Sequence, residues 1–210
     1  SAQAHDFLGG DFYGGREEQL VACRLLRNLS AKQPIEFMTT ISAGLTDHET
    51  LKSQEELDLL AFAATAHGAA FLAIAAWDPD GSINPAALER IRASFEQTRL
   101  YEPFLGGNPV EDVGVYYSSE SKVNFAENGT LLADLATSGA ANYPHFHAVR
   151  GACRALQAAH IPFGILTRRQ LAELDQYRVL VLPNVLRMDA EECAALRAFV
   201  ERGGRLYASR

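Results

Sequence analysis

The sequence has no excess of basic residues, no long apolar run and few cysteines. Its 19 Lys and Arg residues face 26 Asp and Glu, a formal net charge of −7, which argues against nucleic acid or an anionic membrane as the main partner. Apolar runs such as residues 69–77 are far shorter than the ~20 residues that span a bilayer. Almost half of the 210 residues are apolar, so the chain can build one large domain or two small ones.

The cysteines give no sign of a metal site or a disulfide framework. There are three, an odd number, without metal-ligand spacing. Cys23, Cys153 and Cys193 each lie among Ala and Leu in a helical pattern, so we expect small buried apolar side chains. His145 and His147 are two residues apart with no third ligand near them, so no metal is expected there.

Strands and helices alternate along most of the chain, which predicts parallel sheets with right-handed crossovers. Segments rich in Gly and polar residues are predicted to be loops, and Gly and Pro mark a linker over residues 105–112. The predicted strands are 34–41, 69–77, 113–118, 161–166, 177–185 and 205–209. The main predicted helices are 16–31, 55–68, 84–103, 145–159 and 189–202, and the predicted loops are 5–15, 42–53 and 118–140.

Two of the predicted helices have clear apolar stripes. The stripe of helix 55–68 is Leu57, Leu60, Ala61 and Ala64, and that of helix 84–103 is Leu88, Ile91 and Phe95. Gly68 is expected to end the first of these helices, and Asn84 to cap the start of the second.

Functional residues of parallel α/β folds lie just past the carboxyl ends of the strands. In this chain those places hold polar and aromatic residues suited to binding sugars, namely Thr39, Thr40, Asp47, His48, Trp77, Asp78 and Asp80.

The stretch from Leu45 to Ser118 resembles the last two barrel repeats of glycoside-hydrolase-like proteins, in particular α-L-fucosidases and family 42 β-galactosidases. Lys52-Ser53 before a helix, the small-residue strand 69–77 and the turn Pro79-Asp80-Gly81 carry the resemblance. Residues 112 onward resemble the β-galactosidase trimerisation domain, a relative of the class I amidotransferase fold. The resemblance thus implies the C-terminal portion of a (β/α)8-type barrel over residues 1–108, then a flavodoxin-like parallel-sheet domain over residues 109–210.

The resemblance implies hydrolysis of fucoside- or galactoside-type glycosidic bonds, without a cofactor. Asp78 is the expected catalytic carboxyl, although Asp-Pro-Asp-Gly is also strong turn chemistry. Trp77 is expected to stack on a sugar ring, and Thr39, Trp77 and Asp78 to gather around one hollow. Further carbohydrate-binding residues are expected at Asp6, Asp11, Tyr13, Thr39 and His48.

Two departures from the family pattern argue against an active enzyme. Where the β-galactosidase pattern has a Glu at the end of its seventh strand, this chain has Thr39, and Glu36 points to the opposite face of a strand. A barrel also needs ~200–250 residues, and only about 105 precede the linker. The chain starts without Met and stops on a strand. We therefore expect an inactive piece of a longer protein, and we assign no compartment.

The alternative is a non-catalytic module for carbohydrate binding or oligomerisation, and the trimerisation-type domain implies a homo-oligomer. A free-standing flavodoxin-like protein is a third reading. The segment after residues 113–118 lacks a Gly-rich phosphate-binding turn, which disfavours nucleotide or flavin.

Overall fold

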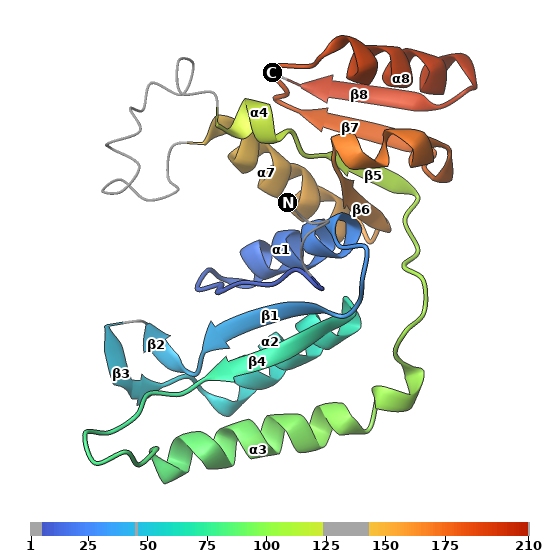
Figure 1. Ribbon diagram of the computed structural model, residues 1–210. Coiled ribbons are helices and arrows are strands. Elements are labelled where there is room, and N and C mark those ends of the chain that lie inside the picture. Colours follow the sequence, from blue (N-terminus) through green and yellow to red (C-terminus); the bar gives the residue numbers. More distant parts are fainter. Residues whose placement is uncertain (1–5, 45, 124–142, 210) are drawn as a thin grey trace. The chain divides into compact units, whose positions relative to one another are not determined.

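The computed structural model describes residues 6–44, 46–123 and 143–209. The chain forms two compact units, Ser1–Pro109 and Val110–Arg210 (Figure 1). Both units combine helices with parallel strands, so the predicted α/β class is confirmed. None of the described helices is long and apolar enough to cross a membrane.

Parallel strands β1 (Ile35–Thr40) and β4 (Ala69–Ile74) form the centre of the first unit. The segment at residues 8–12 runs along the other side of β1, held by three backbone hydrogen bonds of 2.8 to 3.1 Å. Asp11 and Met38 form a parallel bridge within this contact. Prediction of a loop over residues 5–15 is therefore wrong for this part, which pairs with β1 as a strand would.

Gly9 explains why this pairing is hard to see in the sequence. A Cβ atom on Gly9 would lie 2.6 Å from the Cβ of Glu36, so only glycine permits the close approach of the two backbones. Gly9 and its neighbour Gly10 also remove the alternating apolar pattern by which a strand is usually predicted.

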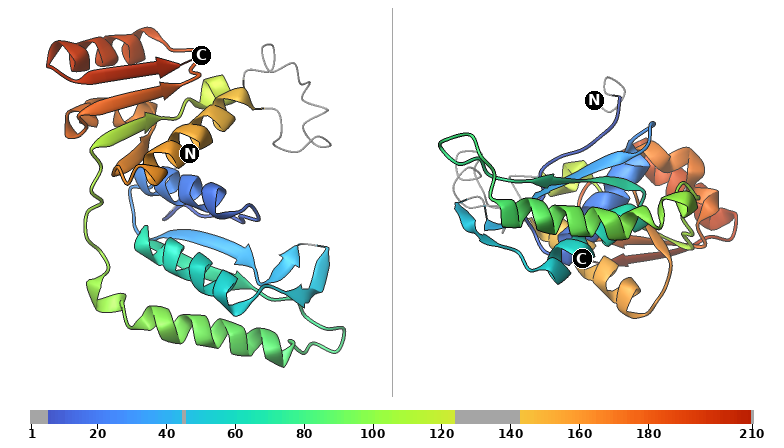
Figure 2. Two further views of the ribbon diagram at one scale, coloured as in Figure 1. Left: turned by 180° about the vertical axis from the view of Figure 1, so that it is seen from behind. Right: turned by 90° about the horizontal axis from the view of Figure 1, so that it is seen from below.

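Helices α1 (Arg16–Leu29), α2 (Gln54–Ala66) and α3 (Pro85–Arg99) follow the three parallel segments in turn. The view from behind shows α2 in front of β1 and β4, covering one face of the strand pair (Figure 2). All four residues of the predicted α2 stripe are buried. The Ser53 side chain accepts a hydrogen bond from the Glu56 amide at 3.2 Å, and Gly68 follows the helix with φ +72°, as a helix end favours.

The predicted stripe of α3 holds only for Ile91, which is half-buried and packs against the cluster of Ile41, Leu57 and Ala87. Leu88 and Phe95 are exposed, and the buried positions are Ala87, Ser94 and Thr98. Compared with the prediction, α3 is rotated about its own axis so that Ser94 faces α2. The Ser94 hydroxyl donates to Asp58 of α2 at 2.6 Å and accepts from Gln54 at 2.9 Å. Asn84 caps α3 as predicted, since its side chain accepts from the Ala86 amide at 2.9 Å. A short helix, η1 (Glu102–Phe104), follows.

The segment between β1 and α2 is a hairpin rather than the predicted loop. Strands β2 (Ser42–Gly44) and β3 (Asp47–Leu51) pair antiparallel. The Asp47 carboxylate accepts hydrogen bonds from the amides of Glu49 and Thr50 at 3.2 and 2.9 Å, which fixes the start of β3 as in an Asx turn.

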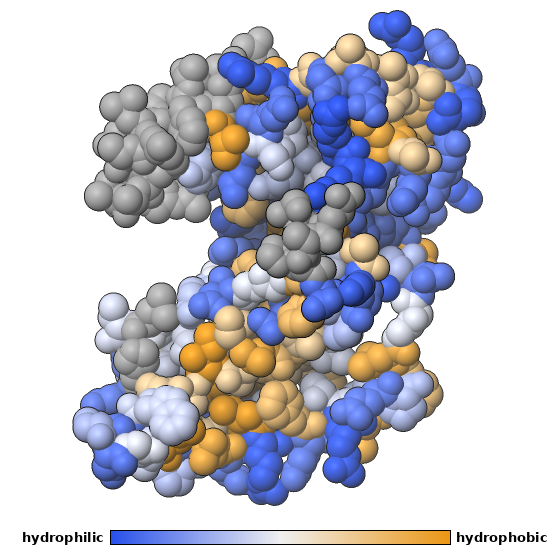
Figure 3. All heavy atoms as spheres, in the orientation of Figure 1, coloured by the Kyte–Doolittle hydropathy of each residue, from blue (hydrophilic) through white to orange (hydrophobic). Residues whose placement is uncertain are grey.

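The two faces of β1 have different surroundings. Ile35 and Phe37 pack against α1 and α2 in a buried cluster. Side chains alternate along a strand, so the opposite face carries Glu36 and Met38, and on β4 it carries the exposed Leu72. In the space-filling view, hydrophobic atoms gather over these strands (Figure 3), so the described chain leaves an apolar strand face uncovered.

The second unit contains one parallel sheet with strand order β6-β5-β7-β8. Its strands lie where the sequence predicts them. They are β5 (Val113–Tyr116), β6 (Phe163–Leu166), β7 (Val179–Pro183) and β8 (Arg205–Ser209). Its helices are α4 (Ser119–Lys122), α7 (Pro144–Ala158), η3 (Arg168–Gln176) and α8 (Ala190–Glu201). The predicted loop over residues 118–140 is wrong for residues 119–122, which form α4, and its residues 124–140 lie outside the described residues.

The core of the second unit joins the sheet to η3 and α8. Leu166, Leu180 and Leu182 of the strands pack there with Leu174 and Phe199 of these helices. The Tyr116 hydroxyl donates a hydrogen bond to the buried Glu192 carboxylate. Burial and this carboxylate both raise the pKa of Tyr116, so the hydroxyl keeps its proton.

The cysteines follow their predicted environment in two of three cases. Cys23 and Cys153 are buried, and burial raises the pKa of the Cys23 thiol to about 12, which makes it unreactive. Cys193 is exposed on α8, because the buried face of that helix is formed by Glu192, Leu196 and Phe199.

Candidate functional site

A hollow of about 500 Å³ lies beyond the carboxyl end of β4. Three segments of the first unit line it: the hairpin β2–β3, the loop after β4 and the start of α3. The lining residues are Ile41, Ser42, Glu49, Leu51, Ala76, Trp77, Asp78, Asn84, Pro85 and Ala87. Its apolar floor includes Ile41 and Ala87, which belong to a buried cluster.

Trp77 and Asp78 both line this hollow, as the sequence predicts for residues after a strand. Strand β4 ends at Ile74 rather than Trp77, so both residues lie in the loop that follows. The Trp77 side chain is 73% exposed. A flat apolar ring that faces solvent beside a carboxylate is suited to a ligand with one apolar face and polar edges.

The loop from Asp78 to Ser82 is held by its own hydrogen bonds. The Asp78 amide donates to the Ser82 carbonyl, and the Gly81 amide to the Asp78 carbonyl, both at 2.8 Å. Asp80 accepts from the Ser82 hydroxyl at 2.7 Å and from its amide at 2.9 Å. These bonds lower the pKa of Asp80. Asp80 thus serves the turn, and Asp78 receives only a weaker contact of 3.3 Å from the Ser82 hydroxyl.

Lys52 fixes the hairpin that forms the other wall. Its ammonium group donates to the carbonyl oxygens of Thr40, at 2.9 Å, and Ser42. Arg90 of α3 donates in turn to the Lys52 carbonyl. Partial burial lowers the pKa of Lys52, while the nearby Glu56 carboxylate acts in the opposite direction. Lys52 therefore positions this wall and does not itself line the hollow.

Glu49 is a site residue that the sequence pattern did not reveal. It lines the hollow with Asp78, because the hairpin folds it back toward the loop after β4. The one signal in the sequence is the run of polar residues from Asp47 to Thr50. Asn84 also lines the hollow, and its oxygen caps α3, which leaves its NH₂ group as a hydrogen-bond donor.

Thr39 does not join Trp77 and Asp78 at the hollow. Its side chain is buried and shares the helix-facing side of β1 with Ile35 and Phe37, because side chains on a strand alternate. The expected grouping of three residues therefore holds for two of them. His48 lies in β3, and its side chain lies outside what the structure describes.

Asp6, Asp11 and Tyr13 lie away from this hollow. Asp6 is exposed and pairs with Lys32 at 2.8 Å. The Tyr13 hydroxyl donates to Asp11 at 3.3 Å, and Asp11 sits beside Met38 near the carboxyl end of β1. Asp11 and Tyr13 thus lie at the same end of the strands as the hollow, whereas Asp6 lies toward the amino end of β1, and none of the three lines the hollow.

The hollow brings together two carboxylates, an amide, a hydroxyl and an indole ring, which is a set suited to hydroxyl groups and an apolar ring face. Within the described ranges 6–44, 46–123 and 143–209, no group of three or more His, Cys, Asp and Glu side chains could hold a metal ion.

Comparisons with known proteins identify the fold. No family model and no curated protein matches the sequence. The α-L-fucosidase isoenzyme 2 from Paenibacillus thiaminolyticus matches with a TM-score of 0.75 and 20% identity, over 98% of this chain and 30% of that one. The GH42 β-galactosidase Gan42B from G. stearothermophilus matches with a TM-score of 0.75 and 17% identity, over 99% and 33%.

A cold-adapted β-galactosidase from Rahnella sp. R3 matches with a TM-score of 0.71 and 18% identity, over 99% of this chain and 33% of that one. The predicted resemblance to α-L-fucosidases and family 42 β-galactosidases is confirmed at the level of the fold. The chain spans about a third of the length of the solved structures that it matches, and it has the fold of that part of these glycoside hydrolases.

Proposed function

We propose that this chain is part of a glycoside-hydrolase-like protein, in which the first unit contributes one wall of a saccharide site. The first unit would be the C-terminal portion of a (β/α)8-type barrel, and the second a flavodoxin-like, class I amidotransferase-like domain of the trimerisation type. The observation that carries the proposal is the shared hollow of Trp77, Asp78 and Glu49 past the end of a parallel strand, where barrel enzymes bind their substrates.

The uncovered strand face supports the barrel assignment. Segment 8–12, β1 and β4 lie side by side, each followed by a helix, and α2 lies behind the strands. Within the described residues, β4 has no partner on its second side. In a closed barrel, further strands would pair with that edge and their side chains would cover Met38 and Leu72.

The chemistry in the intact protein would be hydrolysis of a fucoside- or galactoside-type glycosidic bond. That reaction uses two carboxyl groups on either side of the scissile bond. Asp78 is the candidate that this chain offers, with Glu49 beside it in the lining. At least one essential carboxyl would come from strands outside this chain, so the 210-residue piece alone would bind sugar without hydrolysing it. No cofactor enters this reaction.

Thr39 supports a second candidate, a non-catalytic module for carbohydrate binding or homo-oligomerisation. It occupies the position where the resemblance places a catalytic Glu, and its side chain is buried on the helix-facing side of β1. Glu36 is the second residue of β1, near the amino end of the strand, and so does not replace it.

Calorimetric titration of the chain with galactose- and fucose-containing oligosaccharides tests the binding site. We expect Trp77→Ala to weaken binding about tenfold, or ~1.4 kcal/mol, because stacking is lost. Phe104→Ala removes another exposed aromatic ring, outside the hollow, and should leave binding unchanged. Equal affinities of wild type and Trp77→Ala, or no binding at all, would contradict the saccharide site.

Hydrolysis of aryl fucosides and galactosides separates the two candidates. We expect turnover by the intact protein, none by the 210-residue chain, and a large loss in the intact Asp78→Asn variant. An intact protein that binds sugars but cleaves none of these substrates would favour the binding module.

A further inference from the structure

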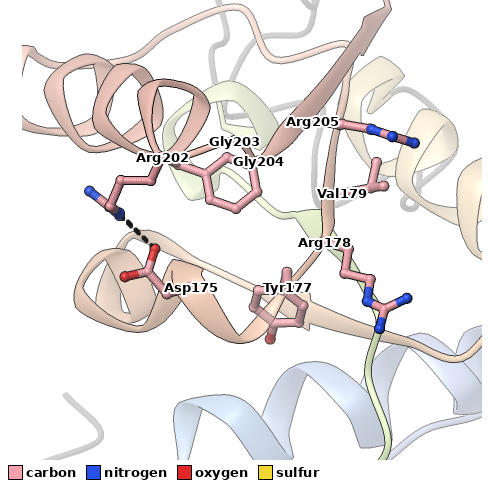
Figure 4. Close-up of a pocket in the computed structure, with 9 residues that line it drawn as sticks. Asp175, Tyr177, Arg178, Val179, Arg202, Gly203, Gly204 and Arg205 are labelled. Atoms are coloured by element: carbon pink, nitrogen blue, oxygen red, sulfur yellow. Dashed lines mark hydrogen bonds and ion pairs between the residues drawn. The ribbon is translucent and has the colours of Figure 1, made fainter.

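A second hollow, of about 580 Å³, lies in the second unit at the amino ends of β7 and β8. Arg178 and Arg205 lie on one side of it, and the paired Arg202 and Asp175 lie on the other (Figure 4). Phe199 also lines it. This end of the sheet is opposite to the carboxyl ends of the strands, so the hollow is separate from any site expected there.

The backbone holds the two strand starts together. The Arg205 amide donates to the Arg178 carbonyl at 3.1 Å, so Arg205, the first residue of β8, lies beside Arg178, which directly precedes β7. Neighbouring strands are ~4.8 Å apart. Gly203 has φ +95°, and a Cβ atom on Gly204 would lie 2.3 Å from the Phe199 ring. These glycines let the chain turn tightly over Phe199, which places the arginines beside an apolar surface.

The side chains that line this hollow carry three positive charges and one negative charge, and the Glu111 carboxylate accepts a hydrogen bond from the lining Tyr177 at 3.0 Å. Arg202 pairs with Asp175 at 2.6 Å. Arg178, whose side chain is 86% exposed, has Asp112 only at 4.0 Å. For Arg205, the described part of the chain offers no ion pair or side-chain hydrogen bond. The second unit as a whole has eleven Lys and Arg and eleven Asp and Glu, so this local excess is not a property of the whole unit.

We propose that this hollow binds an oxyanion, a sulfate or phosphate group carried by a small organic molecule or free in solution. Arg178 and Arg205 would bind its oxygens, because guanidinium groups present several N–H donors in a planar fork that matches such groups. The organic part would lie over Phe199 toward Arg202. The inference rests on the second unit alone and does not depend on the proposed saccharide site.

Calorimetric titration of the full chain carrying Trp77→Ala, which weakens sugar binding in the first unit, provides the test at low ionic strength. The probes are inorganic phosphate, galactose 6-sulfate and neutral galactose. We expect both anions to bind, and galactose not to bind at this hollow. Tighter binding of galactose 6-sulfate would identify an organic oxyanion as the ligand, and tighter binding of phosphate would identify the free ion. Raising the salt concentration should weaken binding, since exposed charges are screened.

Variants locate the binding. Arg178→Ala and Arg205→Ala should each weaken anion binding at least tenfold, and Arg205→Lys should lie between, because it keeps the charge and loses the fork. Arg197→Ala removes an exposed arginine of α8 that does not line the hollow, and should change affinity less than twofold. The idea fails if neither anion binds, or if the Arg178→Ala, Arg205→Ala double variant, with wild-type circular dichroism, binds as the wild type does.

Discussion

Replacing His145 with alanine should loosen the carboxyl ends of β5 and β7 by several kcal/mol. His145 is fully buried in the first turn of α7. Its Nε2 atom accepts a hydrogen bond from the Ser118 amide at 2.9 Å, so the proton is on Nδ1, which donates to the Pro183 carbonyl at 2.8 Å. The His145 ring thereby joins Pro183, at the end of β7, to Ser118, which follows β5.

The size of the effect follows from these contacts. Alanine leaves the Ser118 amide and the Pro183 carbonyl without this partner, and each buried unsatisfied group costs about 1–3 kcal/mol. Packing against Tyr117, whose ring centroid is 5.6 Å from that of His145, is lost as well. A total of about 3–5 kcal/mol corresponds to a roughly 100- to 4,000-fold loss of protection, at ~1.4 kcal/mol per factor of ten.

Amide hydrogen exchange of peptides from β5 and β7, measured by mass spectrometry, is the assay. His147→Ala is the matched control, because His147 is exposed on the same helix and should leave exchange nearly unchanged. Protection in β5 and β7 that stays within threefold of wild type in His145→Ala would refute the reasoning.

The same residue predicts a dependence on pH. Burial lowers the pKa of His145, the Lys122 charge acts in the same direction, and the bonds to the Pro183 and Asn184 carbonyls oppose them. The folded state therefore binds its proton less readily than the unfolded chain, whose His pKa is about 6.5. Protection is complete above that value and falls as the pH drops below it, by at most ~1.4 kcal/mol per pH unit. His145→Ala should remove this slope in β5.

Two further substitutions test the core and the wall of the saccharide hollow. Leu180→Ala should lower the free energy of unfolding in urea by about 2–5 kcal/mol, because Leu180 is fully buried. Leu206, its partner on β8, is 43% exposed, so Leu206→Ala should lower it clearly less. Equal losses in the two variants would contradict the assigned core. Lys52→Met should speed exchange in β2 and β3 by removing its hydrogen bonds to the carbonyl groups of Thr40, at the end of β1, and Ser42, at the start of β2. Lys32→Met breaks only an exposed ion pair, worth ~0–1 kcal/mol, and a similar effect on the hairpin would argue against this role of Lys52.

Local sequence patterns predicted helices and buried strands well. They failed where contacts between residues distant in the sequence determine which face of an element is buried. The α2 stripe is read correctly because four apolar residues recur with the helical period. The face of α3 is misread because polar contacts between Ser94, Asp58 and Gln54 outweigh the burial of Leu88 and Phe95.

The candidate site was predictable where it depends on position after a strand. Trp77 and Asp78 follow β4 and share a hollow as expected. Thr39 was misplaced because a shift of one residue along a strand moves a side chain to the other face. Glu49 was missed because its position depends on the pairing of β2 with β3. Short polar strands lack the sequence pattern from which such pairing is predicted.

The position of the chain's only tryptophan has a practical consequence. Trp77 is largely exposed, lies in the first unit and lines the hollow there. Its indole emission thus originates from one defined place, without a label and without signal from the second unit. A ligand that shields the ring would shift the emission toward shorter wavelengths, whereas an anion seated among the arginines of the second unit would leave the spectrum unaltered.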